Sequence, residues 1–549
     1  MEMAQPTFES LLPDELKTGL TSAERIFLER AAKEKVIDFF SGDEELDKPE
    51  NSHQWGENRA LRANLLIWLF TDNEVNRYIP LRGIYILGTK IIGELDLEGA
   101  ALAFPLGFVG CAILDGIILR DARTRTINFS GSLMGSVNAT RLQTEGDVFM
   151  RSSQVEGEIQ LSGARISGGL NCTGGSFRNP GSYAFVAYGL TTGSDINMST
   201  KFLADGEVSL IGGRVGGNLL CYGASFKNSL STSLNISGST INQNVFLSDG
   251  FNAEGEVCLL GTIVGKNLDC TRATFKHSGG NTFKAVNLEV TGSFTWVDIP
   301  IKPDGFVDLS HARVGQLIDD IESWPEKNKL LLDGFEYGSF ASYAPSTADA
   351  RLGWIDLQPQ GEGSFWTQPY EQLANVFRRM GHEADTRAVL IAKQEALRRY
   401  GQLGWKAKAW NWFLGKTIAH GYKPWKAFLP IAFFVIVGAG VFSWADSEGI
   451  MQPSKERVYL DSRFIESQKL PDRYPRFNSF VYSVDTFFPF VELHQEDYWL
   501  PSASFPSKKY LLGEPLGVYF RFYLWFHIFW GWLLSAFAVA ALTGLTRKD

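Results

Sequence analysis

The chain has 549 residues, a formal net charge of −9 and 44% hydrophobic residues. This length exceeds what one ordinary hydrophobic core organises, so two or three regions are expected. The acidic balance argues against nucleic-acid binding, which needs a basic surface. No dinucleotide fingerprint, phosphate-binding loop, zinc-protease motif or serine-hydrolase motif occurs in the sequence. The sequence therefore predicts no catalytic residue and no cofactor.

Residues 1–80 have a helical pattern. The segment that begins at Ser22 carries apolar residues at helical spacing, among them Ile26, Phe27, Val36 and Phe39. We predict that residues 1–80 form a helical cap, because the end of a repeat array needs protection of its open strand edges. The first residues include acids and no apolar run, so no signal peptide is expected.

Residues 81–320 contain a motif that recurs every 49 residues. It reads GEIQLSGARISGGLNC from Gly157, GEVSLIGGRVGGNLLC from Gly206 and GEVCLLGTIVGKNLDC from Gly255. Apolar residues alternate with polar ones in short runs separated by glycines, which is typical of strands. A fixed period of this size indicates a solenoid. We predict a parallel β-helix with two coils, about 23 and 26 residues long, in each repeat.

The cysteines follow the same repeat. Cys172, Cys221 and Cys270 are 49 residues apart, while Cys111 and Cys258 lie elsewhere. No pair has the spacing of a metal-binding knuckle. We interpret the repeated cysteines as buried core side chains. Disulfides in an oxidising compartment are the alternative. The last, weaker copy of the motif begins at Gly305 and is predicted to replace the cysteine by Asp320.

The segment after the solenoid is mixed. Residues 321–365 are predicted as an irregular connector. Residues 366–426 are predicted as a helical hairpin, broken at Gly381 and followed by a basic collar next to the membrane. From Arg398 to Lys426 there are seven basic residues and no acid. Trp405, Trp410 and Trp412 accompany them, which is typical of an interfacial helix on anionic lipid.

Two segments reach the length of a membrane span. Residues 427–445 contain no charge, and residues 522–545 contain His527 as the one side chain that titrates near neutral pH. Buried core helices are the alternative interpretation. The basic flanks before the first span, with Arg547 and Lys548 after the second, place both termini in the cytoplasm. Residues 446–521 are then an extracytoplasmic loop.

This loop holds the polar residues that could carry chemistry. Residues 477–499 are aromatic and broken by Pro489, which predicts a re-entrant or interfacial segment. Ser483, Asp485 and Thr486 lie where a pore would approach its filter, although no potassium-channel filter sequence is present. Four further residues could bind a divalent cation or belong to a solvated loop tip: Glu492, His494, Glu496 and Asp497. His527, at membrane depth, is either functional or an interfacial anchor.

Asparagines recur at the turns of the solenoid. Asn171, Asn218, Asn244 and Asn267 are candidate ladders on its surface. Long β-helix faces bind sugars or proteins, but turn asparagines also satisfy backbone groups. The sequence is consistent with both interpretations.

Several motifs together resemble a family of bacterial two-span membrane proteins with a pentapeptide-related β-helix. They are RGIYILGTKIIGELDL, the repeated GEV motif, QPYEQLANVFRRMGHEADTRAVLIAKQ, GYKPWKA, YSVDTFFPFVELHQEDYW and FHIFWGWLLSAFAVAALTGLTRK. The resemblance covers nearly the whole chain and implies a location in the bacterial inner membrane. Members are commonly labelled membrane-associated oxidoreductases, a label that no motif here supports. The predicted coils also depart from strict pentapeptide repeats, because they are longer than the coils of such repeats and unequal in length.

Three functions are consistent with this organisation. The first is a membrane protein whose cytoplasmic β-helix is a sensing or docking scaffold for a protein or small ligand. The second is an oligomeric two-span channel gated by the β-helix. The third is a membrane-bound redox enzyme. The expected partners are the lipid bilayer and, for a channel, further copies of the chain.

Overall fold

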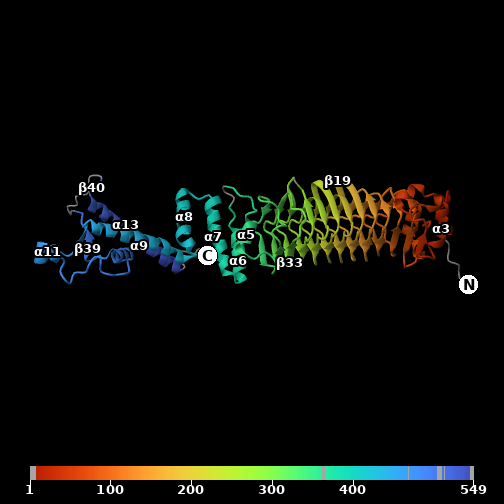
Figure 1. Ribbon diagram of the computed structural model, residues 1–549. Coiled ribbons are helices and arrows are strands. Elements are labelled where there is room, and N and C mark those ends of the chain that lie inside the picture. Colours follow the sequence, from red (N-terminus) through yellow and green to blue (C-terminus); the bar gives the residue numbers. More distant parts are fainter. Residues whose placement is uncertain are drawn as a thin grey trace. The chain divides into compact units, whose positions relative to one another are not determined.

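A computed structural model describes residues 8–277, 279–361, 365–467, 469–503, 510–511 and 514–543. The chain divides into two compact units, Met1–Val389 and Leu390–Asp549. In Figure 1 the first unit is coloured red to cyan and the second continues into blue. The first unit is a parallel β-solenoid of about 11 turns, which confirms the predicted fold class for this region.

Each coil contributes to four parallel ladders of strands, numbered here in the order in which the chain reaches them. The first ladder contains β1 (Val36–Asp38), β3 (Ile84–Leu87), β6 (Leu106–Val109), β10 (Ile127–Asn128), β14 (Val148–Phe149), β18 (Leu170–Asn171), β21 (Ile196–Asn197), β24 (Leu219–Leu220), β27 (Val245–Phe246), β30 (Leu268–Asp269) and the ends of β33 (Glu289–Trp296), β35 (Arg313–Asp319) and β37 (Glu336–Phe340). The fourth ladder contains β9 (Arg123–Thr124), β13 (Gln143–Thr144), β17 (Arg165–Ile166), β20 (Thr191–Thr192), β23 (Arg214–Val215), β26 (Thr240–Ile241), β29 (Ile263–Val264) and the beginnings of β33, β35 and β37.

The second and third ladders share their long strands. The second contains β2 (Ala60–Arg62), β4 (Lys90–Ile92), β7 (Ala112–Ile113), β11 (Leu133–Met134), β15 (Gln154–Glu156), the beginnings of β19 (Ser176–Val186), β22 (Leu203–Ser209), β25 (Ser225–Asn235) and β28 (Asn252–Cys258), and β31 (Thr274–Lys276). The third contains β5 (Leu95–Asp96), β8 (Ile117–Ile118), β12 (Val137–Asn138), β16 (Ile159–Gln160), the ends of those four long strands, β32 (Asn281–Lys284), β34 (Phe306–Asp308) and β36 (Leu330–Leu331).

Alternation along these short strands builds the core. The inward residues that follow the first ladder form one buried column of Phe108, Phe129, Met150, Cys172, Met198, Cys221, Leu247, Cys270 and Trp296. The three repeated cysteines are therefore core side chains, as predicted. Buried side chains fill the interior, and a void inside the coils between Leu190 and Ile241 measures only about 10 Å³.

The sequence repeat comes from two coils of different length. The register pairs Leu170 with Ile196 and Ile196 with Leu219, so a longer coil is followed by a shorter one. The longer coil carries an excursion within β19 or β25, and the shorter coil passes beside it. Gly255 of the shorter coil has φ +135°, and a Cβ there would lie 2.5 Å from the carbonyl oxygen of Asn228. The glycine of the GEV motif therefore lets two backbones approach.

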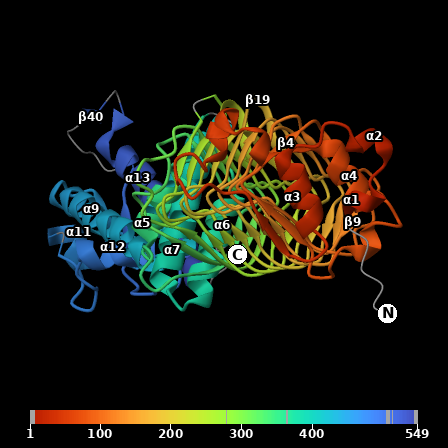
Figure 2. The same ribbon diagram turned by 90° about the vertical axis from the view of Figure 1, so that its right-hand side faces the viewer.

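The N-terminal residues contribute strands as well as helices. Figure 2, which looks at the N-terminal side of the solenoid, shows α3 (Ser22–Arg30) and α4 (Ala63–Thr71) over the end of the coils. Short helices α1 (Phe8–Leu11) and α2 (Asp14–Lys17) precede them. The helix expected to continue through Val36 and Phe39 ends at Arg30, and β1 and β2 pair with the first coil instead. Val36–Asp38 carries two β-branched residues beside a partner strand, so pairing overrides the local helical spacing.

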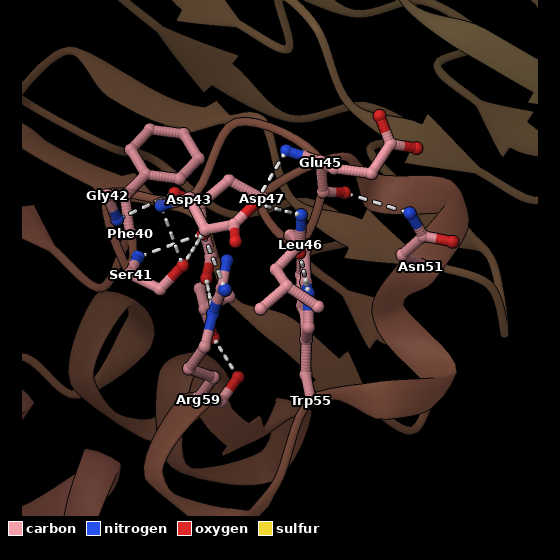
Figure 3. A network of polar contacts seen from close by, with 12 residues as sticks. Phe40, Ser41, Gly42, Asp43, Glu45, Leu46, Asp47, Asn51, Trp55 and Arg59 are labelled. Atoms are coloured by element: carbon pink, nitrogen blue, oxygen red, sulfur yellow. Dashed lines mark hydrogen bonds and ion pairs between the residues drawn. The ribbon is translucent and has the colours of Figure 1, made fainter.

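A polar network fixes the loop between β1 and β2. Asp47 accepts hydrogen bonds from the Ser41 amide at 2.8 Å, the Gly42 amide at 3.0 Å and Arg59 Nη1 at 2.7 Å (Figure 3). Arg59 also donates from Nε to the carbonyl oxygen of Gly88, at 2.8 Å, and so ties the loop to the first coil. Burial raises the pKa of Asp47, but the hydrogen bonds outweigh it and hold the pKa below its usual value.

Strand pairing continues past residue 320, the predicted end of the solenoid. β36 and β37 lie within the predicted irregular connector 321–365, and both pair with the preceding coil. α5 (Ala348–Ile355) follows, while residues 362–364 lie outside the described part. Asp319, rather than the predicted Asp320, takes the place of the repeated cysteine, because it pairs with Trp296 in the ladder.

Glutamine side chains bond to the last coil. Gln372 Nε2 donates to the carbonyl oxygen of Tyr337 at 2.7 Å, and Gln368 Oε1 accepts from the amide of Gly334 at 3.0 Å. Both glutamines belong to α6 (Gln368–Arg379), which Gly381, at φ +79°, separates from α7 (Glu383–Tyr400). Leu373, Val376 and Phe377 are buried as expected, but Met380 is exposed because it lies at the end of the helix.

The second unit contains the apolar helices. Besides the part of α7 from Leu390 onward, its helical elements are α8 (Trp405–Ile418), η4 (Ala419–Gly421), η5 (Pro424–Ala427), α9 (Phe428–Ser447), α10 (Glu456–Tyr459), α11 (Ser462–Ser467), α12 (Ser479–Phe487) and α13 (Leu516–Leu542). The small strand pairs are β38 (Met451–Pro453) with β39 (Trp499–Pro501), and β40 (Tyr510–Leu511) with β41 (Glu514–Pro515). Among the described residues, two helices are long and apolar enough to cross a membrane, over Trp425–Ser447 and Leu516–Ala540.

These helices correspond to the two predicted spans with shifted ends. The second begins at Leu516, earlier than the predicted residue 522, so Arg521 lies inside α13 and not before it. Residues 544 and 545, Arg547 and Lys548 lie outside the described residues.

Candidate functional site

The short helix α12 lies against both apolar helices of the second unit. Ser483 of α12 donates a hydrogen bond from Oγ to the carbonyl oxygen of Val435 on α9, at 2.8 Å. His527 Nε2 of α13 lies 3.2 Å from the same Oγ and 3.1 Å from the carbonyl oxygen of Ser483. One serine therefore links all three helices. Sequence reasoning named Ser483 and His527 separately, and the structure brings them together.

Two glycines allow this close approach. A Cβ on Gly438 of α9 would overlap both the His527 ring and Ser483 Oγ. A Cβ on Gly531 of α13 would overlap the carbonyl group of Phe487. Small residues at helix contacts let backbones come near enough for polar side chains to bond across them. Neither glycine was singled out from the sequence, because helical glycines are common in apolar segments.

The surroundings of His527 are aromatic and closed to solvent. The rings of Phe487, Phe442 and Tyr523 lie 5.1, 5.5 and 5.8 Å from the His527 ring, centroid to centroid. Because Ser483 Oγ gives its proton to Val435, His527 Nε2 carries the hydrogen in this arrangement. His527 Nδ1 is then an acceptor, and it has no partner among the described residues. The site is thus a buried polar clamp between helices.

Asp485 and Thr486 also bond within the chain. Asp485 accepts from the amides of Leu493 at 2.6 Å and Glu496 at 2.9 Å, so its carboxylate holds the turn that follows α12. Thr486 Oγ1 donates to the carbonyl oxygen of Tyr482 at 2.7 Å. Both side chains are buried. The polar groups predicted to approach a pore filter are therefore used in packing α12 and its turn.

The candidate cation ligands lie in that turn and beyond it. His494 Nδ1 and Asp497 Oδ2 approach to 3.1 Å, and both side chains are exposed. Partial burial, together with the carboxylates of Asp485 and Asp497, raises the pKa of Glu496. No group of three or more His, Cys, Asp or Glu side chains that could hold a metal ion occurs within the described ranges. The cluster forms one exposed contact between a histidine and a carboxylate, and a turn whose amides Asp485 binds.

Three of the four candidate ladder asparagines do form a ladder on the solenoid. Asn244 Nδ2 donates to Asn218 Oδ1 at 3.0 Å, and Asn267 Nδ2 donates to Asn244 Oδ1 at 3.0 Å. The same oxygens accept the backbone amides of Asn244 and Asn267, each at 3.1 Å. These side chains thus satisfy the backbone at turns. Asn171 stands at another position, where it accepts from Thr173 of its own turn.

The thiols are poorly suited to redox chemistry. All five cysteines are free and buried. Burial raises the pKa of Cys111 to about 12 and raises those of Cys172, Cys221 and Cys270 as well. A thiol that stays protonated is a poor nucleophile and a poor metal ligand.

Open cavities lie on the outside of the fourth ladder. One of about 480 Å³ is lined by residues from four consecutive coils, including Ala101, Arg123, Gln143 and Arg165. Another of about 400 Å³ lies at the C-terminal end of the ladder, beside Arg313, Glu336 and Arg379. Sequence reasoning missed this face, because its outward side chains are separated by whole coils. The signal becomes visible only when the sequence is aligned at the coil lengths.

No protein-family model, no curated protein and no solved structure matches the chain.

Proposed function

We propose that this chain is a membrane-anchored docking scaffold. Helices α9 and α13 are the two spans, α12 is a short helix clamped between them, and the solenoid presents its outer faces to a partner. The N-terminal residues 8–80 close the first coil, and α6 with its two glutamines closes the last. The resemblance to bacterial two-span proteins supports a location in the inner membrane.

The filled interior of the solenoid carries this proposal. A void of about 10 Å³ cannot hold a substrate, whereas cavities of about 400 and 480 Å³ open on the fourth ladder. The cysteines are buried, and burial raises the pKa of Cys111, so these thiols do not favour the redox enzyme. Binding on a rigid outer surface is the function that this geometry supports best.

The spans and the topology are testable together. We propose that the solenoid and the C-terminus face the cytoplasm, because the segment from Arg398 to Lys426 is basic. Intact cells would carry Ser462→Cys, at an exposed position in α11, or Ser167→Cys, at an exposed position on the solenoid. A membrane-impermeant maleimide should label only the first variant. Labelling of Ser167→Cys alone would show that the topology is the reverse of the one proposed. Release of the protein from membranes by alkaline carbonate would show that α9 and α13 do not span the bilayer.

A second experiment tests docking. A photo-crosslinking amino acid at Thr191, exposed on the fourth ladder, should yield an adduct of discrete mass in native membranes. The same group at Asn287, exposed at a corner between ladders, serves as the control position. Identical adducts from both positions, or none from either, would contradict a docking face on this ladder.

The channel and the redox enzyme receive less support. A short helix between two spans resembles a pore module, but Ser483, Asp485 and Thr486 are buried and bonded within one chain. Conductance in planar bilayers that is lost in the Asp485→Asn variant would support the channel hypothesis. Release of flavin, haem or nicotinamide from the purified protein would support the redox-enzyme hypothesis.

A further inference from the structure

The fourth ladder carries a regular row of outward arginines. Its paired positions read Arg123, Gln143, Arg165, Thr191, Arg214 and Thr240 in successive coils. Arginine therefore stands in every second coil, and a neutral side chain capable of hydrogen bonding stands in the coils between. The coils differ in length, so the arginines are unevenly spaced in the sequence and the row is hidden there.

These three arginines have no counter-ion among the residues that the structure describes. Arg123, Arg165 and Arg214 are exposed, and none of them forms an ion pair or side-chain hydrogen bond with another described residue. The acid in the cavity that Arg123 and Arg165 line, Glu145, lies 3.5 Å from Arg125 and pairs with that arginine. Further along the ladder the pattern changes, since Arg313 pairs with Glu336 at 3.4 Å. The unpaired positive charge of this row thus belongs to the first half of the ladder.

The spacing of the row selects among anionic ligands. Neighbouring parallel strands lie about 4.8 Å apart, so alternate coils repeat about every 9.6 Å. A polyproline II peptide has three residues per turn and rises about 3.1 Å per residue, which gives about 9.3 Å per turn. Acidic residues at every third position of such a peptide all face one side at nearly the spacing of the arginines. A nucleic-acid strand carries a phosphate about every 3.4 Å, which is far denser than this row.

Between Arg165 and Arg214, the surface beside the arginine row leaves room for a peptide backbone. Two residues beyond these arginines in their coils stand Ser167 and Gly216, and Gly193 lies in the coil between. These three positions therefore carry only short side chains or none. A ligand can lie flat there while its side chains reach the arginines.

We infer that the fourth ladder between Arg123 and Arg214 binds an extended acidic segment of a partner protein, with Asp or Glu at every third residue. The inference rests on the proposed docking function and names the face and the chemistry of the partner. Arginine suits this role because its planar guanidinium pairs with a carboxylate through two hydrogen bonds. Three arginines match three carboxylates placed at successive turns of the segment.

The test uses the full-length protein in detergent and fluorescent peptides of equal composition. In EPPEPPEPP the glutamates are three residues apart, and in EPEPEPPPP they are two apart. By fluorescence anisotropy the first peptide should bind at least about fivefold more tightly, and raising the salt concentration should weaken it. Equal affinity of the two peptides would overturn the inference. Tighter binding of a ten-nucleotide single-stranded DNA would overturn it in favour of a nucleic acid.

Matched variants locate the site. An exposed arginine–carboxylate pair changes affinity by about 1.4- to 5-fold, so Arg123→Gln, Arg165→Gln and Arg214→Gln together should weaken binding by about 3- to 100-fold. The control triple is Arg120→Gln, Arg141→Gln and Arg313→Gln, whose arginines already pair with Glu98, Asp121 and Glu336. It should change affinity less than about twofold, and an equal loss in both triples would overturn the inference. Photo-crosslinked adducts that persist in the first triple would leave the docking function standing and exclude this row.

Discussion

Asp319 and Arg351 form a buried ion pair with two parallel hydrogen bonds of 2.7 Å each. Asp319 ends the column that contains Cys270 and Trp296, and Arg351 reaches it from α5. Trp324 Nε1 donates a third hydrogen bond to the carboxylate, at 2.8 Å. The arginine thus neutralises a charge at the point where the repeated core stops, so the last coil depends on α5.

Removing one partner of this pair should destabilise the protein strongly. Arg351→Met leaves the Asp319 carboxylate buried without a counter-charge, which costs about 3–5 kcal/mol. Asp319→Leu combined with Arg351→Met should cost less than the single change, because no charge is left buried. Urea unfolding followed by tryptophan fluorescence measures both. Arg313→Met, which breaks an exposed pair, should cost no more than about 1 kcal/mol. A single variant no less stable than this control would contradict the prediction.

The glycine of the GEV motif should tolerate no side chain. Gly255→Ala places a Cβ against the carbonyl oxygens of Asn228 and Ser231, at 2.5 and 2.7 Å, and keeps an unfavourable φ. We expect a loss of about 3 kcal/mol or more in the free energy of unfolding. Gly261→Ala is the control, since its φ is +62° but nothing lies within 4 Å. It should cost about 1–2 kcal/mol. Equal losses in the free energy of unfolding of the two variants, measured by urea unfolding, would show that the positive φ alone explains why glycine is required.

The contact between the apolar helices should depend on Gly438. Gly438→Ala forces Ser483 and His527 apart, and overpacking of this kind costs about 1–3 kcal/mol. Gly440→Ala is two residues away in the same helix, where a Cβ meets nothing within 4 Å. Thermal loss of helical circular dichroism in detergent should occur at lower temperature for Gly438→Ala only. The same shift in both variants would argue against the close approach of α12.

The buried thiols should respond to alkaline pH. Burial raises the pKa of Cys111 from 9.0 to about 12, so folding favours its protonated form. The resulting stability is fully present below pH 9 and is lost as the pH rises towards 12, because the unfolded chain gains by ionising. Cys111→Ala should therefore lose less stability than the parent between about pH 9 and 11 in urea unfolding.

A disulfide reagent at about pH 8 should react with the thiols only after unfolding. Rapid reaction of the native protein would contradict their burial.

The sequence was most informative where a pattern repeats locally. Alternating apolar residues, glycines and the fixed repeat were enough to predict the β-solenoid, its unequal paired coils and the buried position of Cys172, Cys221 and Cys270. The two apolar helices were also evident from composition. Each of these features depends on neighbours along the chain, so no long-range information is needed to see it.

The tertiary structure decided what distant residues do together. It converted Val36–Asp38 from predicted helix to paired strand, extended the solenoid to Phe340 and moved the charged end of the core from Asp320 to Asp319. It also joined Ser483 to His527, 44 residues away, and aligned Arg123, Arg165 and Arg214 in one row. The periodicity of a sequence reveals which side chains face the core. Which outward side chains become neighbours depends on the register between coils, and that register is set by packing and hydrogen bonding between residues far apart in the chain.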